Sequence, residues 1–136
     1  DEKATGLGDF SQIPGGVPSI ESRLSLIYEG LVNHKTGDRN AALRRWVDVC
    51  STTPARLLGF HTKGRLLPGY DADIVVFDPQ LPHIITAQGL SETAGWTPYE
   101  GLHLRGRPIT TISRGEIIVD GGEWLGEAGR GRFVAR

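Results

Sequence analysis

The sequence predicts an α/β chain, with helices in roughly the first 60 residues and strands in the remainder. Three observations support this prediction. Apolar residues recur at helical spacing in two early segments. Short runs rich in β-branched residues replace that spacing in the second half of the chain. Pro-Gly and Gly-Gly turns separate those runs. The 136 residues are enough for one ordinary domain.

The first predicted helix follows a loop rich in glycine and proline. Ser19 is a candidate N-cap, because a serine oxygen can accept a hydrogen bond from a free N–H of the first turn. The apolar residues of this helix form one stripe at helical spacing: Ile20, Leu24, Ile27 and Leu31. We therefore expect that stripe to be the buried face.

Two further helices are predicted. The second starts near residues 38–40, and its apolar face consists of Leu43, Trp46, Val47 and Cys50. We expect Cys50 to be a buried structural cysteine. The third is short, with Thr53 as its cap, Pro54 at its first position and Gly59 after its last turn.

The strands are shorter and follow one another closely. Residues 74–77 are predicted to form a buried strand, because they are apolar and β-branched between polar neighbours. A single strong turn signal, Asp120-Gly121-Gly122, predicts a hairpin. The other predicted strand segments are residues 83–86, one or two strands within residues 102–112 broken at Gly106, residues 116–119, and residues 123–125 pairing back.

This order of elements is compatible with two architectures. The helices could pack on the sheet as a small α+β domain. Alternatively, the chain could be the tail of a longer α/β chain followed by a separate β module, whose open strand edges need pairing. Pattern alone leaves both open.

Composition excludes several functional classes. Charged residues make up 23% with a net charge of −1, so no basic surface indicates nucleic acid. No run approaches the ~20 apolar residues of a membrane span, and no apolar signal region follows the N-terminus. The single cysteine is expected in a reducing cytoplasm. Methionine is absent even at position 1, which suggests that the chain is a fragment.

Titratable residues show no catalytic pattern. Three aspartates, Asp71, Asp73 and Asp78, flank the strand at residues 74–77, where turn-forming roles explain them best. No histidine belongs to a metal-binding motif, and we expect surface or loop positions for all of them: His34, His61, His83 and His103.

Two glycine-rich segments could contact a ligand. Pro14-Gly15-Gly16 offers backbone without side-chain crowding, although a simple turn explains it equally well. Gly129-Arg130-Gly131-Arg132 could bind an anion, but we favour a solvated tail or a subunit contact. The residues by themselves therefore predict no active site.

Six segments, in order along nearly the whole chain, resemble the C-terminal portion of D-hydantoinases and dihydropyrimidinases of the amidohydrolase superfamily. The region from Lys63 to Pro79, with its Asp71-Ala72-Asp73 core, is widespread in amidohydrolases. The segment from Gly126 to Phe133 is typical of the hydantoinase branch. The six segments are residues 8–16, 20–26, 51–59, 63–79, 97–101 and 126–133.

The resemblance implies an architecture. Residues 1–60 would be the last loop and helices of a (β/α)8 metal-dependent hydrolase barrel. Residues 61–136 would be the C-terminal strands and tail of a β-sandwich built from both chain ends. The remaining N-terminal part of the same polypeptide would complete both, and the family is usually a homotetramer.

The resemblance also implies a chemistry. Family members use two divalent ions, usually zinc, whose bridging hydroxide attacks a small cyclic amide and opens it to an N-carbamoyl amino acid. Their metal ligands and catalytic aspartate would lie upstream of Asp1, so we expect no catalytic residue and no metal ligand in this chain. Neither Asp1 nor Asp9 should be mistaken for the catalytic aspartate. The chain alone should be inactive.

One substrate-binding position carries over by resemblance. The family holds the cyclic amide with main-chain groups of the residue after a proline, which here is Gly15, where asparagine is usual. The particular ring is left open among hydantoins, dihydropyrimidines and allantoin.

Two other hypotheses compete with the interpretation of this chain as a fragment of an enzyme. One is a fragment of a non-catalytic dihydropyrimidinase-like assembly or signalling protein, which lost upstream ligands would identify. The other is a stand-alone small α+β binding domain, which predicts that the 136 residues fold cooperatively alone.

Overall fold

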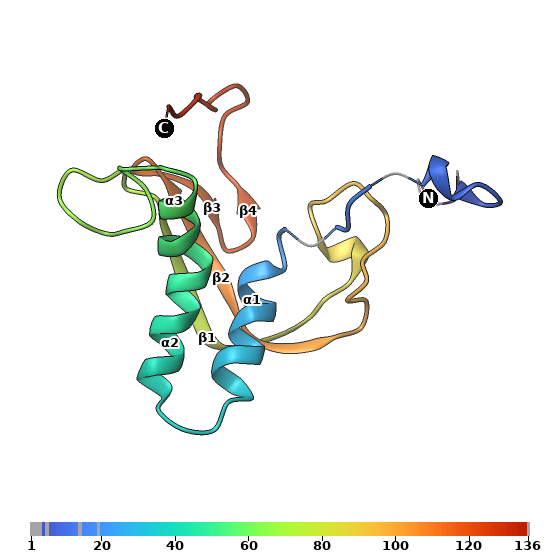
Figure 1. Cartoon of the computed structure of the whole chain (residues 1–136), viewed down its shortest axis with the longest axis horizontal. Coiled ribbons are helices and arrows are strands. Elements are labelled where there is room, and N and C mark those ends of the chain that lie inside the picture. The colour runs from blue at the N-terminus through green and yellow to red at the C-terminus, as the bar shows by residue number, and fades with distance from the viewer. Residues whose placement is uncertain (1–3, 5, 14, 19, 136) are drawn as a thin grey trace.

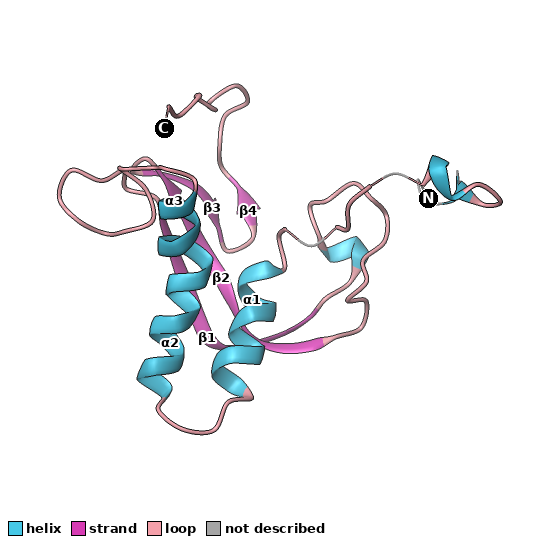
Figure 2. Cartoon of the chain, viewed as in Figure 1, coloured by secondary structure: helices cyan, strands magenta, loops and turns pink. Residues whose placement is uncertain are grey.

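The computed structural model, which describes residues 4, 6–13, 15–18 and 20–135, places helices against one face of a small antiparallel sheet (Figure 1). Figure 2 shows the helices on one side of the strands and the N-terminal segment extending away from both. The helices are α1 (Arg23–Tyr28), α2 (Arg39–Val47) and α3 (Thr53–Leu57). The strands are β1 (Ile74–Ile84), β2 (His103–Ser113), β3 (Glu116–Asp120) and β4 (Glu123–Trp124).

Helix α1 buries a different face from the predicted one. Tyr28 is fully buried and Val32, in the π-helical turn Glu29–Asn33 that follows, is 4% exposed. In contrast, Ile20 lies before the helix and is 79% exposed. The predicted stripe is therefore wrong as the main buried face of α1. Instead, the Tyr28 ring of α1 packs against Phe77 of the sheet. The predicted cap, Ser19, lies outside the described residues.

Helices α2 and α3 form one continuous helical run, so the prediction of a separate third helix is wrong. The run begins as predicted, with Asp38 Oδ1 accepting from the Asn40 N–H at 2.8 Å. A π-helical turn, Asp48–Thr52, joins the two helices, and the Thr53 N–H donates to the Asp48 carbonyl. This wider turn precedes Pro54, which cannot donate to the carbonyl four residues earlier.

The end of α3 agrees with the sequence. Gly59 has a φ of 77°, the left-handed conformation that commonly terminates helices. The Phe60 N–H donates to the Ala55 carbonyl at 2.9 Å and satisfies one of the free carbonyl groups of the last turn.

The sheet is a meander in the order β1-β2-β3-β4, with antiparallel neighbours throughout. Two predicted breaks are absent. Residues 74–77 and 83–84 belong to one strand, β1, whose register shifts between Asp78 and Pro82. Likewise, β2 continues through Gly106, which takes a φ of 104° within the strand. The predicted hairpin at residues 120–122 is confirmed, with Val119 opposite Trp124.

Three aromatic rings join the helices to the sheet. Tyr28 of α1, Trp46 of α2 and Phe77 of β1 have ring centroids 4.7–5.1 Å apart in every pair. Edge-to-face and tilted contacts at these separations are favourable. The Trp46 indole N–H also donates to the Leu24 carbonyl at 3.1 Å. This cluster fixes the helical layer over β1 and β2.

Burial of β1 is weaker than predicted. Val75 and Val76 are each 43% exposed, because the helices cover only one face and β1 has a strand on one side only. Leu57, predicted as an apolar contact of the third helix, is 75% exposed. No helix within the described residues is long and apolar enough to cross a membrane.

Candidate functional site

The segment before α1 contains the predicted substrate-binding position, Gly15. A short 3-10 turn, Phe10–Gln12, opens it, and Asp9 caps this turn by accepting from the Ser11 N–H at 3.0 Å and the Ser11 hydroxyl at 2.7 Å. These hydrogen bonds lower the pKa of the Asp9 carboxyl. Asp9 therefore has a local structural role.

Gly15 itself is exposed, and a Cβ at this position would meet nothing within 4 Å. No hydrogen bond to its backbone comes from the described residues. The next residue, Gly16, has a φ of 91°, which turns the chain. Pro14 and Asp1 lie outside the described residues. The substrate-binding role of Gly15 stays a prediction.

The four histidines do not converge. His34, His61 and His103 are exposed as expected, and His34 Nε2 lies 3.0 Å from Glu29 Oε1. His83 differs, because it is half-buried in β1, where desolvation and the nearby Arg107 lower its pKa. Among the residues that the structure describes, no three His, Cys, Asp or Glu side chains gather as metal ligands would. The described residues therefore do not fit a metal centre.

The aspartates before β1 bind a lysine of the preceding loop. Lys63 Nζ lies 2.9 Å from Asp71 Oδ2 and 2.5 Å from Asp73 Oδ2. On its other oxygen Asp73 accepts the Arg114 N–H from the β2–β3 turn at 2.8 Å. The Gly115 N–H donates to the Ala72 carbonyl beside it at 3.0 Å. We call Lys63, Asp71, Asp73 and the Arg114 N–H the lysine clasp.

The clasp shifts the pKa values of two of its own residues, Asp73 and Lys63. Burial raises the pKa of Asp73, but hydrogen bonds from Lys63 and the Arg114 N–H outweigh burial and lower the pKa overall. Burial lowers the pKa of Lys63, and its two aspartate partners outweigh that effect and raise it. Both groups are therefore held in their charged forms. This arrangement joins the loop to the sheet. Asp78 instead has the predicted turn-forming role, because it accepts the Gln80 N–H at 2.8 Å.

Cys50 is half-buried, whereas the sequence predicts a buried residue. It lines a groove of about 760 Å³ between the α2–α3 run and the loop after α3. Desolvation raises the pKa of the Cys50 thiol, and the nearby Arg23 opposes this effect without cancelling it. A thiol with a raised pKa is a poor nucleophile at neutral pH.

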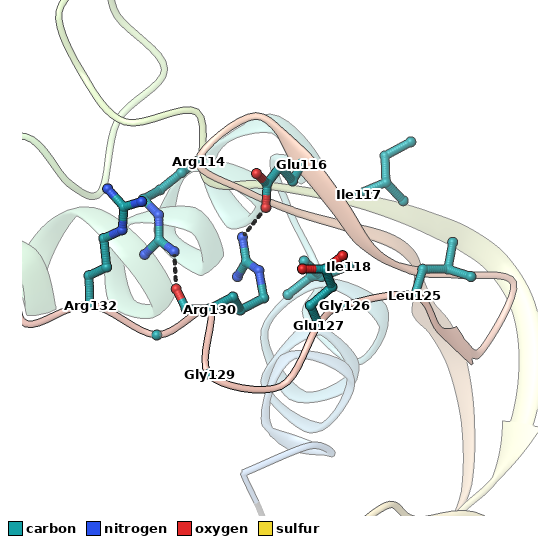
Figure 3. Close-up of a pocket in the computed structure, with 11 residues that line it drawn as sticks. Arg114, Glu116, Ile117, Ile118, Leu125, Gly126, Glu127, Gly129, Arg130 and Arg132 are labelled. Carbon is teal, nitrogen blue, oxygen red and sulfur yellow. Dashed lines mark hydrogen bonds and ion pairs between the residues drawn. The ribbon is translucent and has the colours of Figure 1, made fainter.

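The C-terminal tail is held to the β2–β3 turn through Arg130, while most of its other residues are exposed, as predicted for a solvated tail (Figure 3). The alternative prediction, a subunit contact, stays a prediction. Arg130 donates to the Ser113 carbonyl and to Glu116 Oε2, both at 3.0 Å. Arg114 in turn donates to the Arg130 carbonyl at 2.6 Å. The hydrogen bond and charge of Arg130 lower the pKa of Glu116.

These contacts border an open pocket of about 670 Å³. We call it the arginine pocket; its charged lining residues are Arg114, Glu116, Glu127, Arg130 and Arg132. Sequence reasoning singled out Arg130 and Arg132 but missed Arg114 and Glu116. The only local signal was the Arg114-Gly115 pair in a hairpin turn, which carries no information about a tail 16 residues away.

Comparison with known proteins identifies the family. Residues 14–118 match the amidohydrolase family. The chain belongs to the amidohydrolase family. Its relatives include the D-hydantoinase of Streptomyces coelicolor, 39% identical over 99% of this chain and 28% of that protein. A D-phenylhydantoinase of Escherichia coli is 42% identical over 95% of this chain and 27% of that protein.

Solved structures agree. The crystal structure of dihydropyrimidinase from Brevibacillus agri superposes on this amidohydrolase chain with a TM-score of 0.87 at 36% identity, covering 98% of the chain and 28% of that structure. The predicted resemblance to hydantoinases and dihydropyrimidinases is thus confirmed, as is an α/β fold with a small sheet. This amidohydrolase chain spans about 28% of the length of the relatives it matches.

Proposed function

We propose that this chain is part of a metal-dependent hydrolase that opens a small cyclic amide, of the hydantoin or dihydropyrimidine class, to an N-carbamoyl amino acid. The observation that carries the proposal is the 39% identity to a D-hydantoinase along 99% of the chain. The likeness to a dihydropyrimidinase at a TM-score of 0.87 supports the same reaction class.

We assign residues 1–60 to the end of the hydrolase barrel and residues 61–136 to the C-terminal strands of a β-sandwich. The order of helices before strands supports this division, as does the 28% share of the relatives' length. The contacts of Phe77 with Tyr28 and Trp46 cross the boundary. In this proposal they become the packed interface between barrel and sandwich.

The two divalent metal ions, zinc by family resemblance, belong in this proposal to the remaining part of the polypeptide. We assign no catalytic side chain to this chain, because the resemblance places the metal ligands and the catalytic aspartate upstream of Asp1. We also propose a cytoplasmic location, which the free thiol of Cys50 supports, and a homotetramer, which rests on the family resemblance alone.

The chain's own contribution to the site is the backbone of Gly15. A cyclic amide presents a carbonyl oxygen and a ring N–H next to each other. The Gly15 N–H can donate to such an oxygen, and the Gly15 carbonyl can accept from such an N–H. The open surroundings of Gly15 leave room for a ring to approach.

The activity test compares the 136-residue chain with the complete product of its gene. Both are loaded with zinc and offered hydantoin and dihydrouracil, and the N-carbamoyl products are separated by chromatography. We expect turnover by the complete product and none by the chain alone. Turnover by the chain alone would refute the assignment of the metal ligands to the remaining part of the polypeptide. A zinc-loaded complete product that opens neither ring would favour a non-catalytic assembly protein.

Gly15 is tested in the complete product with two substitutions. Gly15→Pro removes the N–H and should raise KM at least about tenfold, the cost of one well-placed hydrogen bond. Gly15→Asn keeps the N–H and should change KM less than about threefold. Equal effects of the two substitutions would contradict a backbone role.

A further inference from the structure

The arginine pocket has more hydrogen-bond donors than acceptors. Three arginines and two glutamates line it, which leaves a net charge of +1. Arg130 uses Glu116 and the Ser113 carbonyl, and Arg114 uses the Arg130 carbonyl. Each guanidinium has five N–H donors, so most of the donors of Arg114 remain available.

Arg132 is the clearest case. Its side chain is exposed and extends from the tail back toward the turn that carries Arg114 (Figure 3). Within the described part of the chain, no hydrogen bond or ion pair satisfies its guanidinium. It acts on Glu116 only at a distance, through its charge. A structural role in holding the tail therefore accounts for Arg130 but not for Arg132.

The backbone geometry also favours a role for the Arg114 side chain. Arg114 has a φ of 51°, and it is the sole non-glycine with a positive φ among the described residues. Glycine or asparagine would occupy this turn position at lower cost, since the left-handed conformation costs other residues about 1 kcal/mol. An arginine is held here despite that cost.

The floor of the pocket is open to a small ligand. A Cβ at Gly129 or Gly131 would meet nothing within 4 Å, so the tail backbone between the arginines is uncovered. The cavity of about 670 Å³ has room for an ion of a few atoms with its remaining hydration. Planar guanidinium groups bind carboxylate and phosphate oxygens through paired hydrogen bonds.

We propose that the arginine pocket binds a small oxyanion, a phosphate or carboxylate group, with the Arg132 guanidinium as the principal donor and Arg114 as the second. This site is separate from the Gly15 segment and does not depend on the reaction proposed above. Because Arg132 is exposed, the affinity should be modest, with a Kd on the order of 1 mM at low salt.

The test measures the thermal unfolding of the complete gene product with 20 mM inorganic phosphate, sodium acetate or sodium chloride at equal ionic strength. With a Kd on the order of 1 mM, the binding anion should raise Tm by roughly 2–4 °C over chloride. A shift with phosphate alone assigns a phosphate ligand, and a shift with acetate as well assigns a carboxylate or phosphate ligand.

Substitutions separate binding from the general stabilising effect of phosphate. Arg132→Gln should abolish the shift, and Arg132→Lys should keep part of it. Arg44→Gln, at an exposed position on α2, should keep all of it. Arg132→Gln removes no hydrogen bond among the described residues, so the fold should survive. Equal shifts in the parent and the Arg132→Gln protein, or no shift with either anion, would overturn the proposal.

Discussion

Gly106 is the residue whose replacement should most directly test the packing of helices on the sheet. It lies inside β2 with a φ of 104°. A Cβ there would lie 2.8 Å from one carbon of the Phe77 ring and 3.0 Å from one carbon of the Tyr28 ring. Neither ring can move freely, because each also contacts Trp46.

The cost of Gly106→Ala has two parts. The backbone conformation is unfavourable for any residue with a Cβ, at about 1–3 kcal/mol. Forcing one carbon into a packed aromatic cluster adds about 1–3 kcal/mol. Gly37 supplies the matched control, because its φ is 119° and a Cβ there would meet nothing within 4 Å. Gly37→Ala therefore carries the backbone cost alone.

The assay is urea unfolding followed by near-ultraviolet circular dichroism, to which the clustered rings contribute, and the quantity compared is the free energy of unfolding. We expect Gly106→Ala to lose about 1–3 kcal/mol more than Gly37→Ala. Failure of Gly106→Ala to fold while Gly37→Ala folds would support the same reasoning. Losses equal within about 0.5 kcal/mol would refute it, because the rings would then not occupy the space in front of β2.

Three further predictions concern the clasp, the loop after α3 and the thiol. Asp73→Asn should cost about 1 kcal/mol at pH 7, because the amide no longer pairs with the Lys63 charge. The pKa of Asp73 is lowered in the fold, so this stability is present above its ordinary value of 3.8 and is lost as pH falls through the folded value. If the urea midpoints of the parent and Asp73→Asn proteins differed by the same amount at pH 7 and at pH 2.5, this prediction would be contradicted. Gly64→Ala should destabilise more than Gly37→Ala in the same assay, since its Cβ would lie 2.6 Å from the Ala55 Cβ; equal losses would argue against this contact. Cys50 should react with a disulfide reagent roughly tenfold more slowly in the folded than in the urea-unfolded protein, because burial raises its pKa; equal rates would show an open thiol.

Features set by neighbouring residues could be predicted from the sequence. The hairpin at residues 120–122, the start of α2 at Asp38 and the glycine after α3 follow from local backbone chemistry, and the structure confirms all three. Asp38 illustrates the reason. Its carboxylate reaches an N–H two residues away, so the cap needs no knowledge of the rest of the fold.

Features that depend on distant partners were predicted less well. Thr53 and Pro54 have the pattern of a helix start, but the helix runs through them. The π-helical turn before Pro54 accommodates the N–H that proline lacks. Residues 74–77 and 83–86 were likewise predicted as separate strands. In the structure one edge strand, β1, continues through Pro79 and Pro82, because a missing N–H is tolerated at a sheet edge and the register shift spans these residues.

The candidate sites divide in the same way. The role proposed for Gly15 comes from the family resemblance alone, because a backbone contact would leave no side-chain chemistry in the sequence. The arginine pocket brings Arg114 together with Arg130 across a hairpin and a glycine-rich tail. No periodicity links those positions, so only the three-dimensional structure could bring them into one site.

The lysine clasp explains why family motifs can identify an amidohydrolase chain without locating its chemistry. Lys63, Asp71 and Asp73 lie within the most widespread of the matched segments, yet their charges are directed at one another and at the β2–β3 turn. Their pairing joins the loop after α3 to the sheet. In the function proposed above, the reaction depends instead on metal ligands outside these residues, so the activity test uses the complete gene product.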